Sequence, residues 1–155
     1  MKRLLICVAL VLLAAQALAQ GKIVLDYGGM TFGKEMADMK YMKKERQQDV
    51  MTIYTRYGDD HAFQGVPIAE QSYGFVDNKF CLVTFSIKGP SAFNALKAYF
   101  DANYGPAEQP TVNVKKFKYN AGDVEIQFEY SDDKKVGGVS YAYAPIMRKV
   151  MTQKK

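Results

Sequence analysis

The sequence predicts an α+β fold, in which an antiparallel sheet carries two helices packed on one face. Two pairs of strand-like runs are separated by short Asp, Asn or Gly turns, which is typical of antiparallel hairpins. Apolar and polar residues alternate along several of these runs, as expected for a sheet with one buried face. Helical spacing is confined to two short segments. The 155 residues, 48% hydrophobic and 24% charged, suit one domain with a core of its own.

Residues 1–19 have the form of a signal peptide. Two basic residues follow Met1, residues 4–13 are an apolar run, and Ala17-Leu18-Ala19 has the small-x-small form of a cleavage site. The apolar run is shorter than the roughly 20 residues that a membrane-spanning helix needs. We therefore expect cleavage near Ala19 and a periplasmic or secreted mature chain without a transmembrane segment.

The basic charge of the chain lies at its two ends. The net charge is +5, but the leader holds two of the bases and residues 148–155 hold four bases and no acid, which leaves residues 20–147 at −1. Because a nucleic-acid binder needs a basic face on the domain itself, we predict no nucleic-acid partner. The predicted organisation is a signal peptide (1–19), a single α+β domain (20–147) and a basic C-terminal tail (148–155). The tail is either a solubilising end or a contact for anionic lipid or cell-wall polymer.

In the first half, we expect a short strand within residues 20–27 and an amphipathic helix over 34–44, with Met36 and Met39 on its apolar side. Strands should follow where β-branched and aromatic residues gather. Their expected ranges are 50–57, 68–76 and 79–87. Asp77-Asn78 separates the last two and predicts a hairpin turn.

In the second half, a helix over 91–104 is expected to begin at Ser91 as N-cap and to end at Gly105. Strands are expected over 111–119, 123–130 and 138–144. The order of a helix followed by three strands would then occur twice, as in a tandem αβββ repeat.

The hairpin of residues 111–130 also explains a cluster of lysines. If Asn120 pairs with Asp123, then Lys118 lies opposite Glu125 on the polar face, and Lys116 lies diagonally across from Glu125 and Glu129. Cross-strand charge pairing on a solvated face accounts for these lysines without a ligand.

Cys81 is the only cysteine left after removal of the leader, so the mature chain cannot form an internal disulfide. It shares one face of its strand with Val83, Phe85 and Ile87. We therefore expect a buried thiol with a packing role rather than a reactive one.

The sequence lacks the motifs of the common catalytic centres. His61 is the only histidine, and no G-x-S-x-G, Walker or dinucleotide pattern is present. Adjacent loop residues such as Asp59, Asp60 and His61 rarely converge on one metal ion. We predict no catalytic residue, no metal and no cofactor. Paired carboxylates from distant positions stay open as an alternative.

Residues 54–105 carry a resemblance. They contain Ser72-Tyr73-Gly74-Phe75, then Asp77-Asn78-Lys79-Phe80, and finally Tyr104-Gly105. This segment resembles a family of small, uncharacterised exported bacterial proteins with a YGF-x-x-x-KF hairpin before a helix that ends in YG. The doubled helix-plus-three-strand order is also similar to that of beta-lactamase inhibitor protein and of small outer-membrane assembly lipoproteins.

The aromatic content is the unusual feature of the composition. The chain has eleven Tyr and nine Phe, more than a core of this size needs, and tyrosine is common at contact surfaces. We expect most of these rings in the core. Candidate partner-binding residues are Tyr54, Arg56, Tyr57, Tyr141 and Tyr143.

The function predicted from these features is that of an exported, non-enzymatic binding module whose partner is an unknown protein or envelope component. One alternative is an inhibitor of an extracytoplasmic hydrolase, which would insert a loop such as 58–67 into the cleft of its target. A carboxylate-based hydrolase is the other.

Overall fold

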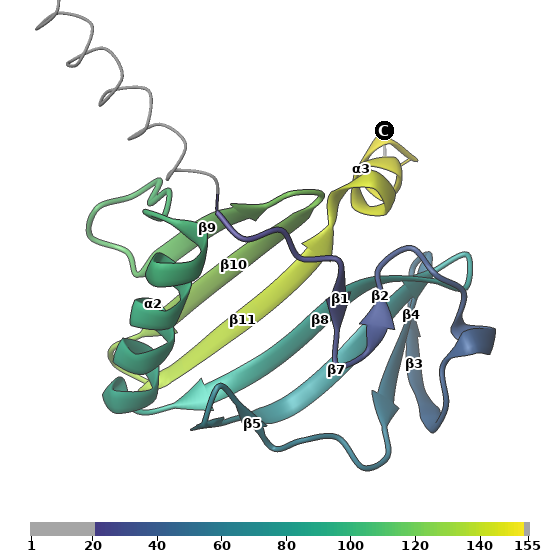
Figure 1. Ribbon diagram of the computed structural model, residues 1–155, viewed down its shortest axis with the longest axis horizontal. Coiled ribbons are helices and arrows are strands. Elements are labelled where there is room, and N and C mark those ends of the chain that lie inside the picture. Colours follow the sequence, from purple (N-terminus) through teal and green to yellow (C-terminus); the bar gives the residue numbers. More distant parts are fainter. Residues whose placement is uncertain (1–20, 154–155) are drawn as a thin grey trace, which may run out of the picture.

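Seven strands form one antiparallel sheet in the computed structural model, which describes residues 21–153 (Figure 1). Their order across the sheet is β3-β4-β7-β8-β11-β10-β9. The strands are β3 (Met42–Gln48), β4 (Met51–Arg56), β7 (Ala69–Val76), β8 (Lys79–Lys88), β9 (Lys116–Ala121), β10 (Val124–Ser131) and β11 (Val136–Tyr143). Two small hairpins lie outside the sheet: β1 (Asp26–Tyr27) with β2 (Met30–Thr31), and β5 (Ala62–Phe63) with β6 (Val66–Pro67). This architecture confirms the predicted α+β class.

The β7–β8 hairpin forms where the sequence predicts it. Asp77 and Asn78 both have positive φ, 48° and 59°, a conformation that Asp and Asn tolerate better than other side chains. Val76 and Lys79 are therefore direct partners. Along β8, Val83, Phe85 and Ile87 are buried and alternate with half-buried residues. Cys81 is buried as predicted.

Helix α2 (Pro90–Tyr104) covers one face of the sheet (Figure 1). Its buried residues follow helical spacing and are Phe93, Leu96, Phe100 and Tyr104. The helix ends at Gly105 as predicted, with φ at 80° and the Gly105 N–H bonded to the Asp101 carbonyl. The predicted N-cap is wrong by two residues: Gly89, with φ at 86°, precedes the helix, and Pro90 is its first residue. Proline suits this position because its missing N–H is not needed there.

The helix predicted over 34–44 is wrong. Only Met36–Asp38 forms a single 3-10 turn, and Met42–Gln48 is edge strand β3, paired with β4. Charged residues dominate β3, and nearly all of its side chains are exposed, which protects a sheet edge from pairing with another chain. Because this helix is missing, the order of elements does not repeat within residues 21–153.

A second helix, α3 (Ala144–Gln153), forms instead at the C-terminal end of the described chain. Its Met147 and Val150 line a groove with Leu82 and Thr84 of β8. These β8 residues alternate with Val83 and Phe85, which face α2, so the two helices do not pack on one face as predicted. Helix α3 extends over Arg148 and Lys149, the start of the predicted basic tail.

In the β9–β10 hairpin the side chains lie on their predicted faces of the sheet, but the two strands pair in a different register. Ala121 pairs with Val124, so Phe117 lies opposite Phe128 and Lys116 opposite Glu129. The register differs by two residues, which keeps every side chain on its predicted face. Ion pairs Lys116–Glu129 (3.8 Å) and Lys118–Glu125 (2.6 Å) confirm the charge pairing.

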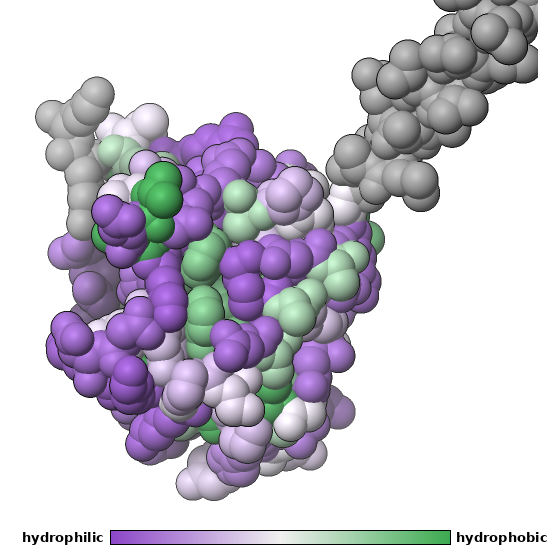
Figure 2. Space-filling view, turned by 90° about the vertical axis from the view of Figure 1, so that its left-hand side faces the viewer, coloured by the Kyte–Doolittle hydropathy of each residue, from purple (hydrophilic) through white to green (hydrophobic). Residues whose placement is uncertain are grey.

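Aromatic side chains dominate the core between α2 and the sheet. Phe100 lies 5.5 Å from both Tyr119 and Phe128, measured between ring centroids. Most of the Tyr and Phe residues are buried, which confirms their main role. On the side that carries α2, hydrophilic residues cover most of the surface, and apolar residues form only narrow stripes between them (Figure 2).

Candidate functional site

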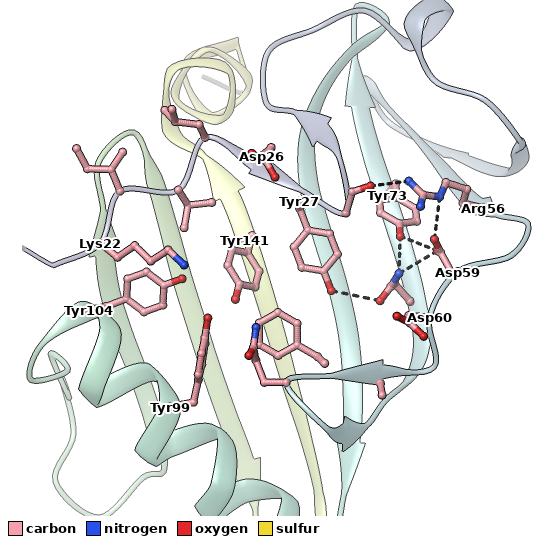
Figure 3. Close-up of a pocket in the computed structure, with 18 of the residues that line it drawn as sticks. Lys22, Asp26, Tyr27, Arg56, Asp59, Asp60, Tyr73, Tyr99, Tyr104 and Tyr141 are labelled. Atoms are coloured by element: carbon pink, nitrogen blue, oxygen red, sulfur yellow. Dashed lines mark hydrogen bonds and ion pairs between the residues drawn. The ribbon is translucent and has the colours of Figure 1, made fainter.

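A cavity of about 720 Å³ lies where α2, the 58–64 loop and the N-terminal segment meet over the sheet (Figure 3). We call it the tyrosine cavity. Five tyrosines line it: Tyr27, Tyr73, Tyr99, Tyr104 and Tyr141. Its charged lining residues are Lys22, Asp26, Arg56, Asp59 and Asp60. It is therefore a polar and aromatic site rather than a gap in the apolar core.

The N-terminal segment is held in place along one side of the cavity. The Lys22 N–H donates to the Asn103 carbonyl at 2.8 Å, and the Val24 N–H donates to Ala121 at 3.1 Å. Further along, the Phe32 N–H donates to the Leu25 carbonyl at 3.1 Å. These backbone bonds fix residues 22–28 across the sheet, so that Lys22 and Tyr27 face the cavity.

Asp59 is the centre of a hydrogen-bond network at one end of the cavity (Figure 3). Its Oδ1 lies 2.9 Å from the Arg56 Nε in an ion pair. Its Oδ2 accepts hydrogen bonds from the Tyr73 hydroxyl at 2.6 Å and from the Gln71 Nε2 at 2.9 Å. The Tyr27 hydroxyl extends the network by donating to the Gln71 Oε1 at 3.2 Å. Both Asp59 oxygens are thus occupied by internal partners.

Tyrosine hydroxyls gather at the other end, where those of Tyr99, Tyr104 and Tyr141 point toward one another beside the Lys22 ammonium (Figure 3). Burial raises the pKa of Tyr104, and the neighbouring Tyr99 phenol raises it further. Burial is also the main cause of the raised pKa of Tyr141. These phenols therefore stay protonated well above neutral pH and can both donate and accept hydrogen bonds.

The pKa values of Tyr27 and Tyr73 are raised as well. Burial is the largest cause for both, and the Asp59 carboxylate adds to it because a second negative charge beside it is unfavourable.

Phe63 anchors the 58–67 loop to the core. In the β5–β6 hairpin its ring lies 5.2 Å from Phe85, 5.6 Å from Tyr99 and 6.1 Å from Tyr27 between centroids. The loop is therefore a fixed wall of the cavity and does not project as an isolated segment.

The structure brings two of the five candidate residues to this cavity. Arg56 and Tyr141 line it. Tyr57 is 74% exposed and lines a neighbouring groove with Arg56. Tyr54 packs edge-on against Phe75 at 5.2 Å, and Tyr143 stacks on Phe32 at 6.1 Å, so both have roles in packing.

Several lining residues carry no sequence signal of their own. Tyr27, Gln71 and Tyr99 lie on three elements that only the tertiary fold brings together. Tyr104 is recognisable in the sequence as the end of a helix, but nothing local shows that it faces a cavity.

His61 is exposed and does not line the cavity. Within residues 21–153, no group of three or more His, Cys, Asp or Glu residues is placed to hold a metal ion. In the same range, neither helix is long and apolar enough to cross a membrane.

Comparisons with protein-family models, curated proteins and solved structures find no match to this chain. The resemblance to exported bacterial proteins with a YGF-x-x-x-KF hairpin stays a prediction.

Proposed function

We propose that the protein is an exported, non-enzymatic binding module and that the tyrosine cavity is its ligand site. The observation that carries this proposal is a set of charged side chains in the cavity walls that have no partner among the described residues. Within residues 21–153, Lys22, Asp26 and Asp60 form no side-chain hydrogen bond or ion pair. The cavity also has the volume and the mixture of rings and polar groups typical of small-molecule sites.

The partners of Asp59 argue against its use as a catalytic carboxylate. A general acid or base needs an oxygen that can reach a substrate proton. Asp59 is the least exposed of the three cavity aspartates, and its two oxygens already hold Arg56, Gln71 and Tyr73. This arrangement supports a structural role for Asp59.

The inhibitor alternative has less support. It needs a loop that projects into another protein, whereas Phe63 ties the 58–67 loop to the rings of its own core. The proposed partner is therefore a molecule that enters the cavity.

Backbone amide NMR of the chain from Gln20 onward tests the proposal. Small sugars, amino acids and short peptides would be added in turn to the ¹⁵N-labelled protein. We expect at least one of these classes to shift the amide signals of Tyr27, Phe63 and Tyr99. Signals of Ser86 and Gln127, which lie outside the cavity lining, should stay in place. The proposal fails if no class shifts the cavity signals.

Export itself has a separate test. Osmotic-shock fractionation of cells that produce the full chain should release a form that begins near Gln20, as read by N-terminal sequencing. An uncleaved form retained in the cytoplasm would contradict it.

A further inference from the structure

We infer that the tyrosine cavity is one part of a longer binding trough, and that its ligand is an uncharged oligosaccharide chain. This inference rests on the proposed function and adds the class and length of the ligand.

A second hollow of about 610 Å³ adjoins the cavity, and we call it the outer groove. Arg56 and Gly58 line both hollows. At the turn between β1 and β2, Gly28 lines the cavity and Gly29 lines the outer groove. The Arg56 Nη1 donates to the Gly28 carbonyl at 3.0 Å, so these two residues form the boundary between the two hollows. A ligand longer than the cavity would lie across this boundary and reach the outer groove.

Two exposed tyrosines mark the far end of the outer groove. Tyr41 is 73% exposed and Tyr57 is 74% exposed. The Tyr57 N–H donates to the Tyr41 carbonyl at 3.0 Å, which holds the two residues side by side. Tyr41 has a φ of 66° and immediately precedes strand β3.

The charge of the trough favours an uncharged ligand. Its bases and acids are intermixed: Lys22, Asp26, Asp38, Lys40, Arg56, Asp59 and Asp60. A nucleic acid or another polyanion needs a surface of one sign, which this trough does not provide. A ligand rich in hydroxyl groups instead needs partners that both donate and accept, as the phenols of Tyr99, Tyr104 and Tyr141 do.

The aromatic groups also suit a sugar. The C–H bonds on the face of a sugar ring carry slight positive charge and pack well on the negative face of an aromatic ring. Tyr41 and Tyr57 offer exposed rings of this kind. An extended peptide added as a strand would need a free sheet edge. The strands below the cavity, β7, β8 and β11, each have a neighbour on both sides, so their backbone groups are paired.

The test compares oligosaccharides of two lengths by the same NMR titration. The probes are the uncharged hexasaccharides hexa-N-acetylchitohexaose, cellohexaose and maltohexaose, each with its disaccharide. We expect one hexasaccharide to shift the signals of Tyr27 and Tyr99 in the cavity and those of Gly29 and Tyr41 in the outer groove. Its disaccharide should shift only the cavity signals and bind more weakly.

Tyr57→Ala tests the outer groove. It should weaken binding of the hexasaccharide by about fivefold to tenfold and leave the disaccharide unaffected, because an aromatic contact is lost only by the longer ligand. Tyr57→Phe is the matched control and should keep the affinity, since the ring is retained. Equal loss for both sugar lengths would overturn the trough.

A decaproline peptide separates this inference from the proposed function. If decaproline shifts the cavity signals and no sugar does, the inference of an oligosaccharide ligand is wrong, while the proposal of a binding module stands. If neither sugars nor decaproline nor the amino acids shift them, both proposals fail.

Discussion

The Tyr73 hydroxyl donates a 2.6 Å hydrogen bond to the Asp59 carboxylate, which also forms an ion pair with Arg56. One carboxylate thus holds a core strand, the 58–67 loop and one end of the cavity together. Arg56, Gln71 and Tyr73 all bond to Asp59. From the sequence alone, Asp59 would be interpreted as part of a solvated turn.

Asp59→Asn should lower the free energy of unfolding by about 2–3 kcal/mol, because Arg56 and Tyr73 lose a charged acceptor while they remain partly buried. Urea denaturation of the two proteins measures the difference. Asp60→Asn is the matched control: its side chain is exposed and its effect should stay within about 0.5 kcal/mol. Equal stability of Asp59→Asn and the natural protein would show that the network contributes nothing.

Tyr130→Phe should raise the free energy of unfolding by about 1 kcal/mol. The Tyr130 hydroxyl is buried and has no hydrogen-bond partner within the described residues. On folding it loses its hydrogen bonds to water and gains none, so its removal eliminates this cost. Tyr73→Phe provides the comparison and should lower stability, since it breaks the bond to Asp59. Thermal unfolding followed by circular dichroism distinguishes the two. A loss of stability in Tyr130→Phe would mean that the hydroxyl has a favourable contact.

Gly137 and Gly138 are adjacent on β11 but should respond differently to alanine. A Cβ on Gly137 would lie 2.9 Å from the Glu129 carbonyl oxygen and 3.0 Å from Ile87 Cγ1, too close for either to remain in place. Gly137→Ala should therefore cost about 1–3 kcal/mol. A Cβ on Gly138 would approach only Glu129 Cγ, at 4.0 Å, so Gly138→Ala should be neutral or slightly stabilising. Similar urea midpoints for both variants would contradict this packing.

The Cys81 thiol should resist modification in the folded protein. Burial raises its pKa to about 12, so the reactive thiolate is on the order of one in ten thousand molecules at pH 8. Ellman's reagent should react slowly with the native chain and quickly once guanidinium chloride has unfolded it. Rapid reaction without denaturant would show that the site opens readily.

Alkaline pH should destabilise the protein through its buried tyrosines. The folded-state pKa values of Tyr73, Tyr104 and Tyr141 lie above the ordinary value of 10, so their stabilising contribution is complete below about pH 10. It is lost as the pH rises toward the folded-state values, because the unfolded chain then gives up protons that the folded chain keeps.

Tyr141→Phe tests this effect for one residue. Above about pH 10.5 its unfolding free energy should fall less steeply than that of the natural protein, by up to about 1.4 kcal/mol per pH unit. Between about pH 7 and 9 both proteins should show the same pH dependence. Identical slopes above pH 10.5 would mean that Tyr141 ionises as easily in the folded chain as in the unfolded one.

The elements predicted correctly are those whose signals are local. The β7–β8 turn needs residues that accept positive φ, and Asp77-Asn78 supplies them. Helix α2 lies between Pro90 and Gly105, and its apolar spacing is regular. Strand β3 was missed because its Lys, Glu, Arg and Gln residues favour an exposed helix, and only pairing with β4 makes it a strand.

The candidate site was less accessible from the sequence. Alternation along β11 placed Tyr141 on one face, but it could not show whether that face is core or cavity. Tyr27 and Tyr99 come together only because the N-terminal segment bonds to Asn103 and Ala121, which is a property of the folded chain. The aromatic content predicts a contact surface without locating it, because the position of the cavity depends on the tertiary fold.

The walls of the tyrosine cavity extend from Lys22, near the first described residue, to Tyr141, in the last strand. Strand β11 lies between β8 and β10, so a chain that stops before it lacks both the floor of the cavity and the strand that joins the two halves of the sheet. The proposed ligand site and the continuity of the sheet therefore depend on the same strand.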